Sequence, residues 1–228
     1  MQTEEFLSIW AGLDRGDTVN FDGTYLRVDG AFDMFRPFQP HLPLYFGGSS
    51  KAAMEVAARH IDLYLTWGEP PELVAQKISA MRAEAAITGR QLRFGIRFHV
   101  VVRDTVAEAR RAAEKLMEHV TPEIAEASQR ELAKVESAGQ KRMLELQRGG
   151  GEHLWLRPDL WAGVGQVRGG AGTAMVGDGA TVAALMREYI DLGIDTFICS
   201  GYPHLEEAYH FAEHVFPHFA VCRKRRAW

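Results

Sequence analysis

Apolar positions along this chain switch between two spacings. From residue 42 onward, short apolar runs are followed by longer stretches in which apolar residues recur at helical spacing. Strands that alternate with helices predict βαβ units and a parallel sheet. The predicted strands cover 42–46, 61–67, 92–103 and 195–200, and the predicted helices cover 51–60, 72–87, 105–119, 181–192 and 204–215.

The chain before residue 42 follows a different pattern. Residues 4–14 have helical spacing, and Asp22-Gly23 between two alternating runs predicts a β-hairpin over 18–28. Three prolines in 36–43 predict an extended connector, because each proline disfavours helix in the residue before it.

Residues 120–165 interrupt the alternation of strands and helices. They begin as a charged helical stretch and then pass through Arg148-Gly-Gly-Gly-Glu152. We interpret 104–165 as a helical and flexible insertion within a single domain, 1–228. The pattern indicates three or four parallel strands, whereas a complete (β/α)₈ barrel needs eight strands and about 250 residues. The predicted fold is therefore α/β, with either a small open sheet or part of a barrel.

Composition excludes several classes of protein. A net charge of −4 and a pI of about 6.1 favour neither nucleic acid nor an anionic membrane as a partner, and the basic run 223–226 has the pattern of a solvated end. Cys199 and Cys222 match no metal motif and no disulfide framework. The N-terminus has no signal-peptide pattern, and no run approaches the ~18 apolar residues of a membrane span. We expect a cytoplasmic protein.

Candidate chemistry lies where the predicted strands end, which is where parallel α/β enzymes place function. Gly48, Ser49 and Ser50 stand between a strand and a helix, and the small residues, hydroxyls and free helix N–H groups suit a phosphate. An ordinary tight turn has the same pattern. Trp67 ends the next strand, where it would stack on a flat ligand or pack in the core.

The strand 93–100 carries the most specific signal. Its alternation puts Arg97 and His99 on the face opposite Phe94, Ile96 and Phe98. A central strand buries both faces, and buried cations need partners. Arg97 and His99 therefore face a ligand or form a structural ion pair with a carboxylate.

Two later segments bring further polar groups. Residues 161–173 contain five glycines around Arg168, which is typical of a mobile arm that delivers a guanidinium to an anion, or of a flexible linker. Tyr202 and His204 follow the last strand. His210 and His214 have the spacing of metal ligands, but no third ligand is predicted, so we expect no metal site.

Five stretches together resemble the FMNH2-dependent alkanesulfonate monooxygenases of the bacterial luciferase-like superfamily. The resemblance extends over about residues 4–218. The stretches are 45–50, 62–72, 93–99, 167–173 and 200–207.

The resemblance implies a TIM (β/α)₈-barrel enzyme that uses reduced FMN and O2 to cleave alkanesulfonates to an aldehyde and sulfite. The FMNH2 comes from an NAD(P)H-dependent FMN reductase. By similarity, Ser49 and Ser50 would face the FMN phosphate, and Arg168 would close over the site. Arg97 would clamp the sulfonate, and His99 or Tyr202 would handle protons. The flavin and sulfonate pocket would be lined by Trp67, Arg97, His99, Tyr202 and His204.

The sequence departs from this family in one large respect. The family has an N-terminal region with the first barrel strands and an active-site cysteine, and neither Cys199 nor Cys222 lies in that cysteine's motif. The chain thus matches about the last four βα units plus an N-terminal helix and β-hairpin, an incomplete barrel that we expect to form homo-oligomers. The alternatives are a non-catalytic half barrel that binds flavin or anions, or that serves oligomerisation, and a related monooxygenase with another substrate.

Overall fold

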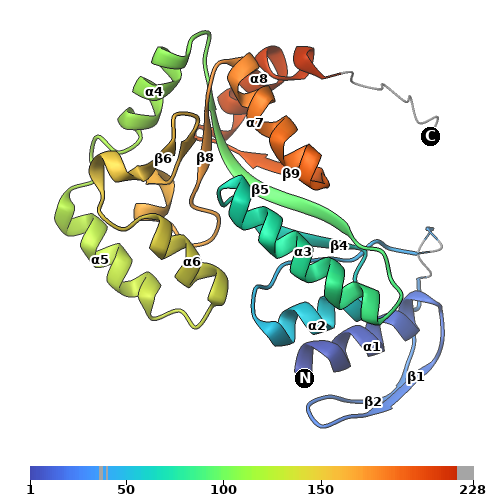
Figure 1. The fold of residues 1–228 in the computed structure, drawn as a ribbon. Coiled ribbons are helices and arrows are strands. Elements are labelled where there is room, and N and C mark those ends of the chain that lie inside the picture. Colours follow the sequence, from blue (N-terminus) through green and yellow to red (C-terminus); the bar gives the residue numbers. More distant parts are fainter. Residues whose placement is uncertain (36–37, 40, 220–228) are drawn as a thin grey trace. The chain divides into compact units, whose positions relative to one another are not determined.

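The computed structural model describes residues 1–35, 38, 39 and 41–219 (Figure 1). The chain divides into two compact units, one of residues 1–65 and 80–93 and one of residues 66–79 and 94–228. Strand β4 (Leu63–Trp67) and helix α3 (Pro71–Ile87) each contribute to both units. Cys222, the basic run 223–226 and part of the predicted connector lie outside the described residues.

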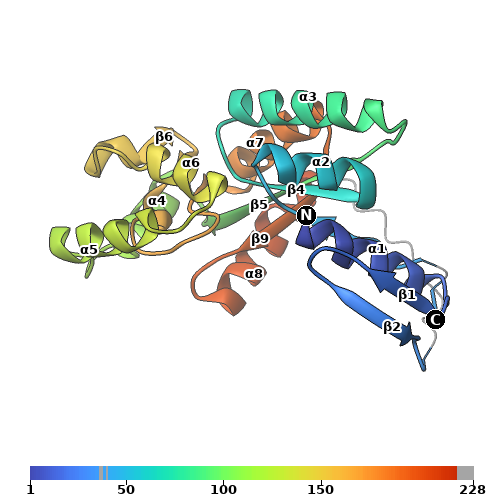
Figure 2. The same ribbon diagram turned by 90° about the horizontal axis from the view of Figure 1, so that it is seen from below.

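The first unit confirms the predicted hairpin. Strands β1 and β2 are antiparallel, and Figures 1 and 2 show them beside α1. The Glu5 carboxylate of α1 accepts hydrogen bonds from the backbone N–H groups of Thr24, Tyr25 and Leu26 at 2.8–2.9 Å, which ties the turn to the helix. The elements here are α1 (Gln2–Asp14), β1 (Val19–Asp22), β2 (Arg27–Ala31), β3 (Tyr45–Phe46) and α2 (Lys51–His60).

Strand β3 pairs in parallel with the start of β4. One histidine fastens this region, because the two ring nitrogens of His41 lie 3.0 Å from Asp14 and 2.9 Å from Asp62. These two hydrogen bonds raise the pKa of His41. Asp62 also accepts a hydrogen bond from the N–H of Leu44 at 2.7 Å, just before β3.

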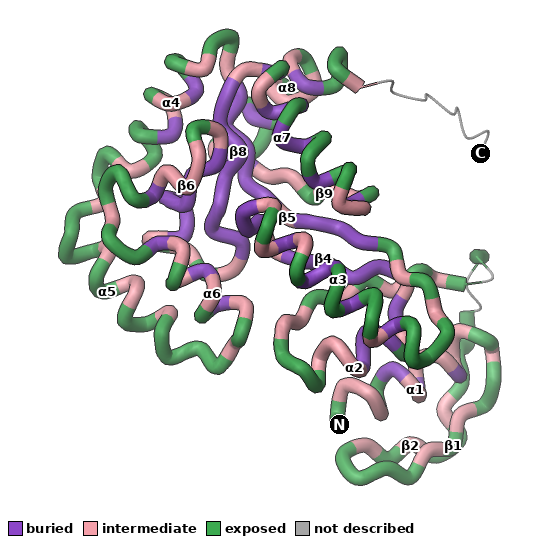
Figure 3. Tube along the Cα trace, in the orientation of Figure 1, coloured by how far each residue is buried: buried purple, intermediate pink, exposed green. Residues whose placement is uncertain are grey.

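The second unit is built around the long strand β5 (Arg93–Val102). Strand β9 (Ile194–Ser200) pairs in parallel with its first part, and β8 (Ala174–Gly177) pairs in parallel with its last part. Strands β7 (Leu160–Trp161) and β6 (Trp155–Arg157) extend the sheet antiparallel from β8. Burial is concentrated along β5 and β8 (Figure 3).

Side-chain caps begin four helices of this unit, and the helix predicted over 105–119 ends at Lys115. Thr105 accepts the N–H of Glu108 and donates to its carboxylate, and this pair of hydrogen bonds is a capping box. Asp178 caps α7, and Gly193, with φ of 106°, ends it. The helices are α4 (Val106–Lys115), α5 (Pro122–Ala133), α6 (Ala138–Leu146), α7 (Gly179–Leu192) and α8 (His204–His214), and the 3₁₀ helices span Gly151–Leu154, Gly163–Gln166 and Phe216–His218.

The glycine-rich segment 161–173 is more ordered than the sequence indicates. It holds part of β7 and a 3₁₀ helix, and Gly165, Ala171 and Thr173 are buried. The flexible-linker interpretation is therefore wrong. The sequence also does not predict β6, β7 and β8, because these strands are two to four residues long and too short for a periodic pattern. Among the described residues, no helix has the length and apolar character needed to cross a bilayer.

Candidate active site

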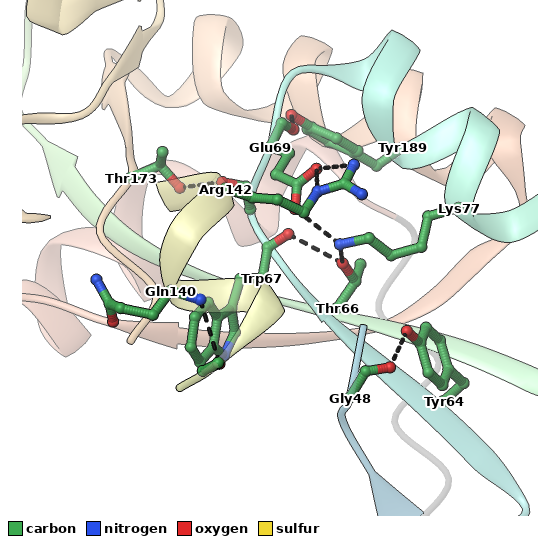
Figure 4. Close-up of polar contacts among 12 residues, drawn as sticks. Gly48, Tyr64, Thr66, Trp67, Glu69, Lys77, Gln140, Arg142, Thr173 and Tyr189 are labelled. Carbon is green, nitrogen blue, oxygen red and sulfur yellow. Dashed lines mark hydrogen bonds and ion pairs between the residues drawn. The ribbon is translucent and has the colours of Figure 1, made fainter. Parts of the chain in front are cut away.

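Strand β5 places two neighbouring segments along one of its edges. The N–H of Gly68, just after β4, donates to the carbonyl of Arg97 at 2.9 Å, and the N–H of His99 donates to the carbonyl of Thr173 at 2.9 Å. The Thr173 hydroxyl in turn donates to the Gly68 carbonyl at 2.5 Å (Figure 4). The end of β4 and the start of β8 thus meet beside Arg97 and His99.

The predicted alternation along β5 is confirmed. Phe98 is fully buried on one face, where its ring packs 5.1 Å from that of Tyr189, centroid to centroid. His99, on the other face, is 1% exposed, and Arg97 is half-buried. The polar face of this strand therefore points away from the Phe98 core, as the period of two requires.

His99 is held by three groups from two segments. Its Nε2 lies 2.8 Å from Nη1 of Arg168 and 3.0 Å from the carbonyl oxygen of Ala171. Its Nδ1 lies 3.1 Å from the Ser200 hydroxyl at the end of β9. Burial, together with the Arg168 and Arg97 cations, lowers the pKa of His99 to about 4, so the ring is neutral near pH 7.

Two further aromatic rings, those of Tyr202 and His204, form a row of ring contacts with His99. The Tyr202 ring stacks on the His99 ring with centroids 5.5 Å apart and an interplanar angle of 24°. The centroid of the His204 ring lies 5.0 Å from that of Tyr202. Nδ1 of His204 hydrogen-bonds the Gly201 carbonyl, which fixes the ring where α8 begins. The loop after β9 thus brings Tyr202 and His204 to the residues of β5, as their positions after a strand indicated.

The half-buried Arg97 side chain has a buried nitrogen that makes no hydrogen bond. Its Nε is buried without a hydrogen-bond partner. Within the described chain, no carboxylate pairs with Arg97 or His99. The ion-pair interpretation of these two residues is therefore wrong. A buried donor without a partner costs about 1–3 kcal/mol, and such groups are typical of sites that receive a ligand.

The segment that carries Arg168 is held by glutamines of the insertion. Gln140 of α6 accepts the N–H of Gly170 at 3.0 Å, and Gln129 of α5 donates to the carbonyls of Gly165 and Gln166 at 3.0 and 3.1 Å. Figures 1 and 2 show α5 and α6 side by side. These glutamines could not be predicted from the sequence, because the residues that they contact lie 30 or more positions away along the chain and leave no local pattern.

A buried charge cluster lies where β4 ends. Lys77 donates to Glu69 and to the Thr66 hydroxyl at 2.7 Å each, and Arg142 of α6 makes hydrogen bonds of 2.8 and 3.2 Å to the second oxygen of Glu69 (Figure 4). Glu69 is 1% and Lys77 6% exposed, and burial lowers the pKa of Lys77. The cluster fastens α6 to the strand end beside Trp67. Glu69 stood in a motif of the sequence, but its partners were not predictable.

Trp67 is half-buried, and α6 approaches it closely. A Cβ atom at Gly139 would stand 3.1 Å from its ring, so the helix passes over the indole at a distance that suits glycine. The Trp67 side chain is thus partly covered by α6 and partly exposed to solvent.

Gly48, Ser49 and Ser50 belong to the first unit, whereas the other predicted site residues belong to the second. The Ser50 side chain caps α2 by accepting the N–H of Ala53 at 3.2 Å, and the Gly48 carbonyl accepts the Tyr64 hydroxyl at 2.7 Å. The first turn of α2 has no acidic residue. This geometry is that of a capped tight turn, and it leaves the helix N-terminus suitable for a phosphate.

Cys199 and the pair His210 and His214 offer little support for nucleophilic or metal chemistry. Burial raises the pKa of the Cys199 thiol to about 12, so it stays protonated and is a poor nucleophile. The rings of His210 and His214 stack 6.1 Å apart, and in the described part of the chain no third histidine, cysteine or carboxylate joins them to form a metal site.

A family model for luciferase-like monooxygenases matches residues 1–196. The chain belongs to the luciferase-like monooxygenase family. This family includes flavin-dependent monooxygenases, and the chain has their α/β fold.

Solved structures have the same fold. DmoA from Hyphomicrobium sulfonivorans is 17% identical with a TM-score of 0.72, and the match covers 95% of this chain and 54% of that one. EDTA monooxygenase from Chelativorans sp. BNC1 is 19% identical with a TM-score of 0.69, covering 95% and 58%. Riboflavin lyase, solved with modified FMN and riboflavin, is 22% identical with a TM-score of 0.67, covering 87% and 47%. The chain spans about half the length of these proteins.

Proposed function

We propose that this chain carries the anion-binding and proton-handling residues of an FMNH2-dependent alkanesulfonate monooxygenase. The observation that carries the proposal is the pair of arginines at β5: Arg97 and Arg168 lie beside a neutral His99, and no carboxylate among the described residues pairs with them. Two guanidinium groups near a neutral acid–base side chain suit a compact anionic head group such as a sulfonate.

The two arginines, His99 and the neighbouring Tyr202 and His204 each have a distinct role in the proposal. Arg97 and Arg168 bind sulfonate oxygens, because guanidinium groups are planar donors that do not lose their protons. His99 holds or transfers a proton at Nε2, and Tyr202 is the second proton handler. His204 positions Tyr202 through ring contact.

The proposal includes reduced FMN as the co-substrate, and each unit taken by itself offers residues that suit a part of it. Gly48, Ser49 and Ser50 would hold its phosphate at the N-terminus of α2, where the first turn has no carboxylate to repel it. Trp67 would pack on the flavin ring. When bound, reduced flavin with O2 supplies the oxidising chemistry, and an NAD(P)H-dependent FMN reductase is the expected partner.

A second candidate requires only the anion-binding residues. A half barrel that binds flavin and anions without turnover, or that associates with further copies, is the alternative function.

One experiment separates the two candidates. The chain is titrated with FMNH2 without oxygen, and then assayed in air for sulfite release from octanesulfonate with a flavin reductase present. Sulfite release that is lost in Arg97→Met supports the enzyme. Binding of FMNH2 without sulfite release refutes turnover by this chain and supports the half-barrel alternative.

A further inference from the structure

His99 has more hydrogen-bond partners than a neutral imidazole satisfies at one time. Its Nε2 faces both Nη1 of Arg168, at 2.8 Å, and the carbonyl oxygen of Ala171, at 3.0 Å. A guanidinium only donates and a carbonyl only accepts. Arg168 therefore requires a lone pair on Nε2, whereas Ala171 requires a proton there. The two contacts are alternatives that correspond to the two tautomers of the ring.

The second ring nitrogen adapts to either tautomer. Nδ1 lies 3.1 Å from the Ser200 hydroxyl, and a serine hydroxyl both donates and accepts. Ser200 accepts when Nδ1 carries the proton and donates when it does not. A doubly protonated ring would satisfy Ala171 and Ser200 but not Arg168, and burial beside two arginines disfavours it because these lower the pKa of His99 to about 4.

We propose that Arg168 sets the tautomer of His99, and that the Ser200 hydroxyl pairs with Nδ1 in either state. With Arg168 on Nε2, the proton sits on Nδ1 and bonds to Ser200. With Arg168 drawn to an anion, the proton sits on Nε2 and bonds to Ala171, while Ser200 donates to Nδ1. The net protonation of the ring is unchanged. The part played by the anion rests on the proposed function.

The surrounding contacts let the Arg168 side chain change partner without moving its segment. Gln140 holds the N–H of Gly170 and Gln129 holds the carbonyl of Gly165, so the backbone is fixed on both sides. Arg168 itself is half-exposed. A charge-assisted hydrogen bond is roughly twice as strong as a neutral one, so Arg168 dominates while it has no anionic ligand. A bound anion thereby converts Nε2 of His99 from an acceptor into a donor that faces the ligand.

The test is ¹⁵N NMR of the full chain labelled at histidine, at pH 7, because protonated and bare ring nitrogens have widely separated chemical shifts. The chain has 9 histidines, and the spectrum of His99→Gln assigns the His99 signals. We expect the Nδ1–H tautomer in excess by roughly tenfold in the unliganded protein. Arg168→Met reverses the ratio, and Arg168→Lys, which keeps a cationic donor, retains it. Ser200→Ala removes the Nδ1 partner of both tautomers, so the Nδ1–H tautomer stays in excess while Arg168 is present.

The same tautomer in the parent chain and in Arg168→Met, both with native circular dichroism, overturns the role of Arg168. A reversed ratio in Ser200→Ala overturns the assignment of the tautomer to Arg168. Sodium octanesulfonate added to the parent chain is expected to reproduce the Arg168→Met spectrum, and an unchanged spectrum at saturation overturns the role of the anion. The variants are compared without flavin or turnover, so failure of the sulfite assay leaves this result standing.

Discussion

Replacing Glu69 tests the energetics of the buried cluster that joins α6 to the end of β4. Glu69→Gln has nearly the same shape but removes the charge that faces Lys77 at 2.7 Å and Arg142 at 2.8 Å. Lys77 is 6% exposed, so its ammonium group loses its ionic partner where water does not replace it. Removing one member of a buried pair costs about 3–5 kcal/mol, a large part of the 5–15 kcal/mol typical of whole domains.

The other members of the cluster predict a graded series. Lys77→Met leaves Glu69 paired with Arg142 and costs less, about 1–3 kcal/mol. Arg142 is 37% exposed at its side chain, so Arg142→Gln costs about 1 kcal/mol or less. The double variant Glu69→Gln, Lys77→Met removes the orphaned charge and recovers most of the loss, because a buried ion pair is replaceable by uncharged side chains.

The measurement is urea unfolding followed by circular dichroism, with the slope of free energy against urea checked for constancy. Glu126→Gln on the exposed face of α5 is the matched control, with an expected change within about 0.5 kcal/mol. The cost of Glu69→Gln persists in 1 M NaCl, where an exposed pair is screened. A cost below about 1 kcal/mol, or strict additivity of the double variant, would refute the reasoning.

Three further predictions concern the candidate site. The pKa of His99 is 6.5 in the unfolded chain and about 4 in the folded one, so the unfolded state binds the proton first as the pH falls. The free energy of unfolding therefore decreases by about 3 kcal/mol as the pH is lowered from 6.5 to 4. His99→Gln flattens the plot of this free energy, measured by urea unfolding, against pH, and an unchanged slope contradicts the assignment. Gly139→Ala places a Cβ 3.1 Å from the Trp67 ring, so the ring shifts and tryptophan fluorescence changes, and Trp67→Phe abolishes this change. Because alanine also favours a helix over glycine by roughly 0.5–1 kcal/mol, the free energy of unfolding changes by less than about 1 kcal/mol. Gln140→Leu leaves the N–H of Gly170 without its acceptor and costs about 1–3 kcal/mol, with faster amide hydrogen exchange at Gly170 as the specific sign; protection equal to the parent chain argues against the glutamine clamp.

The sequence determined the features that depend on local periodicity. Alternation along β5 placed Arg97 and His99 on one face, and this is confirmed, since side chains of a strand point to opposite sides whatever lies around it. Capping chemistry at Thr105 and Gly193 is equally local. The motifs also indicated the family to which the chain belongs.

Tertiary structure decided which polar groups meet and in what state. His99 is neutral because burial and two arginines act on it together, and Arg168 lies 69 positions farther along the chain. Glu69 and Arg142 are 73 positions apart. Partners at such separations are chosen by how the strands and helices pack, and no spacing rule along the chain encodes them. The order of the glycine-rich segment likewise comes from the glutamines of α5 and α6, which its own composition does not reveal.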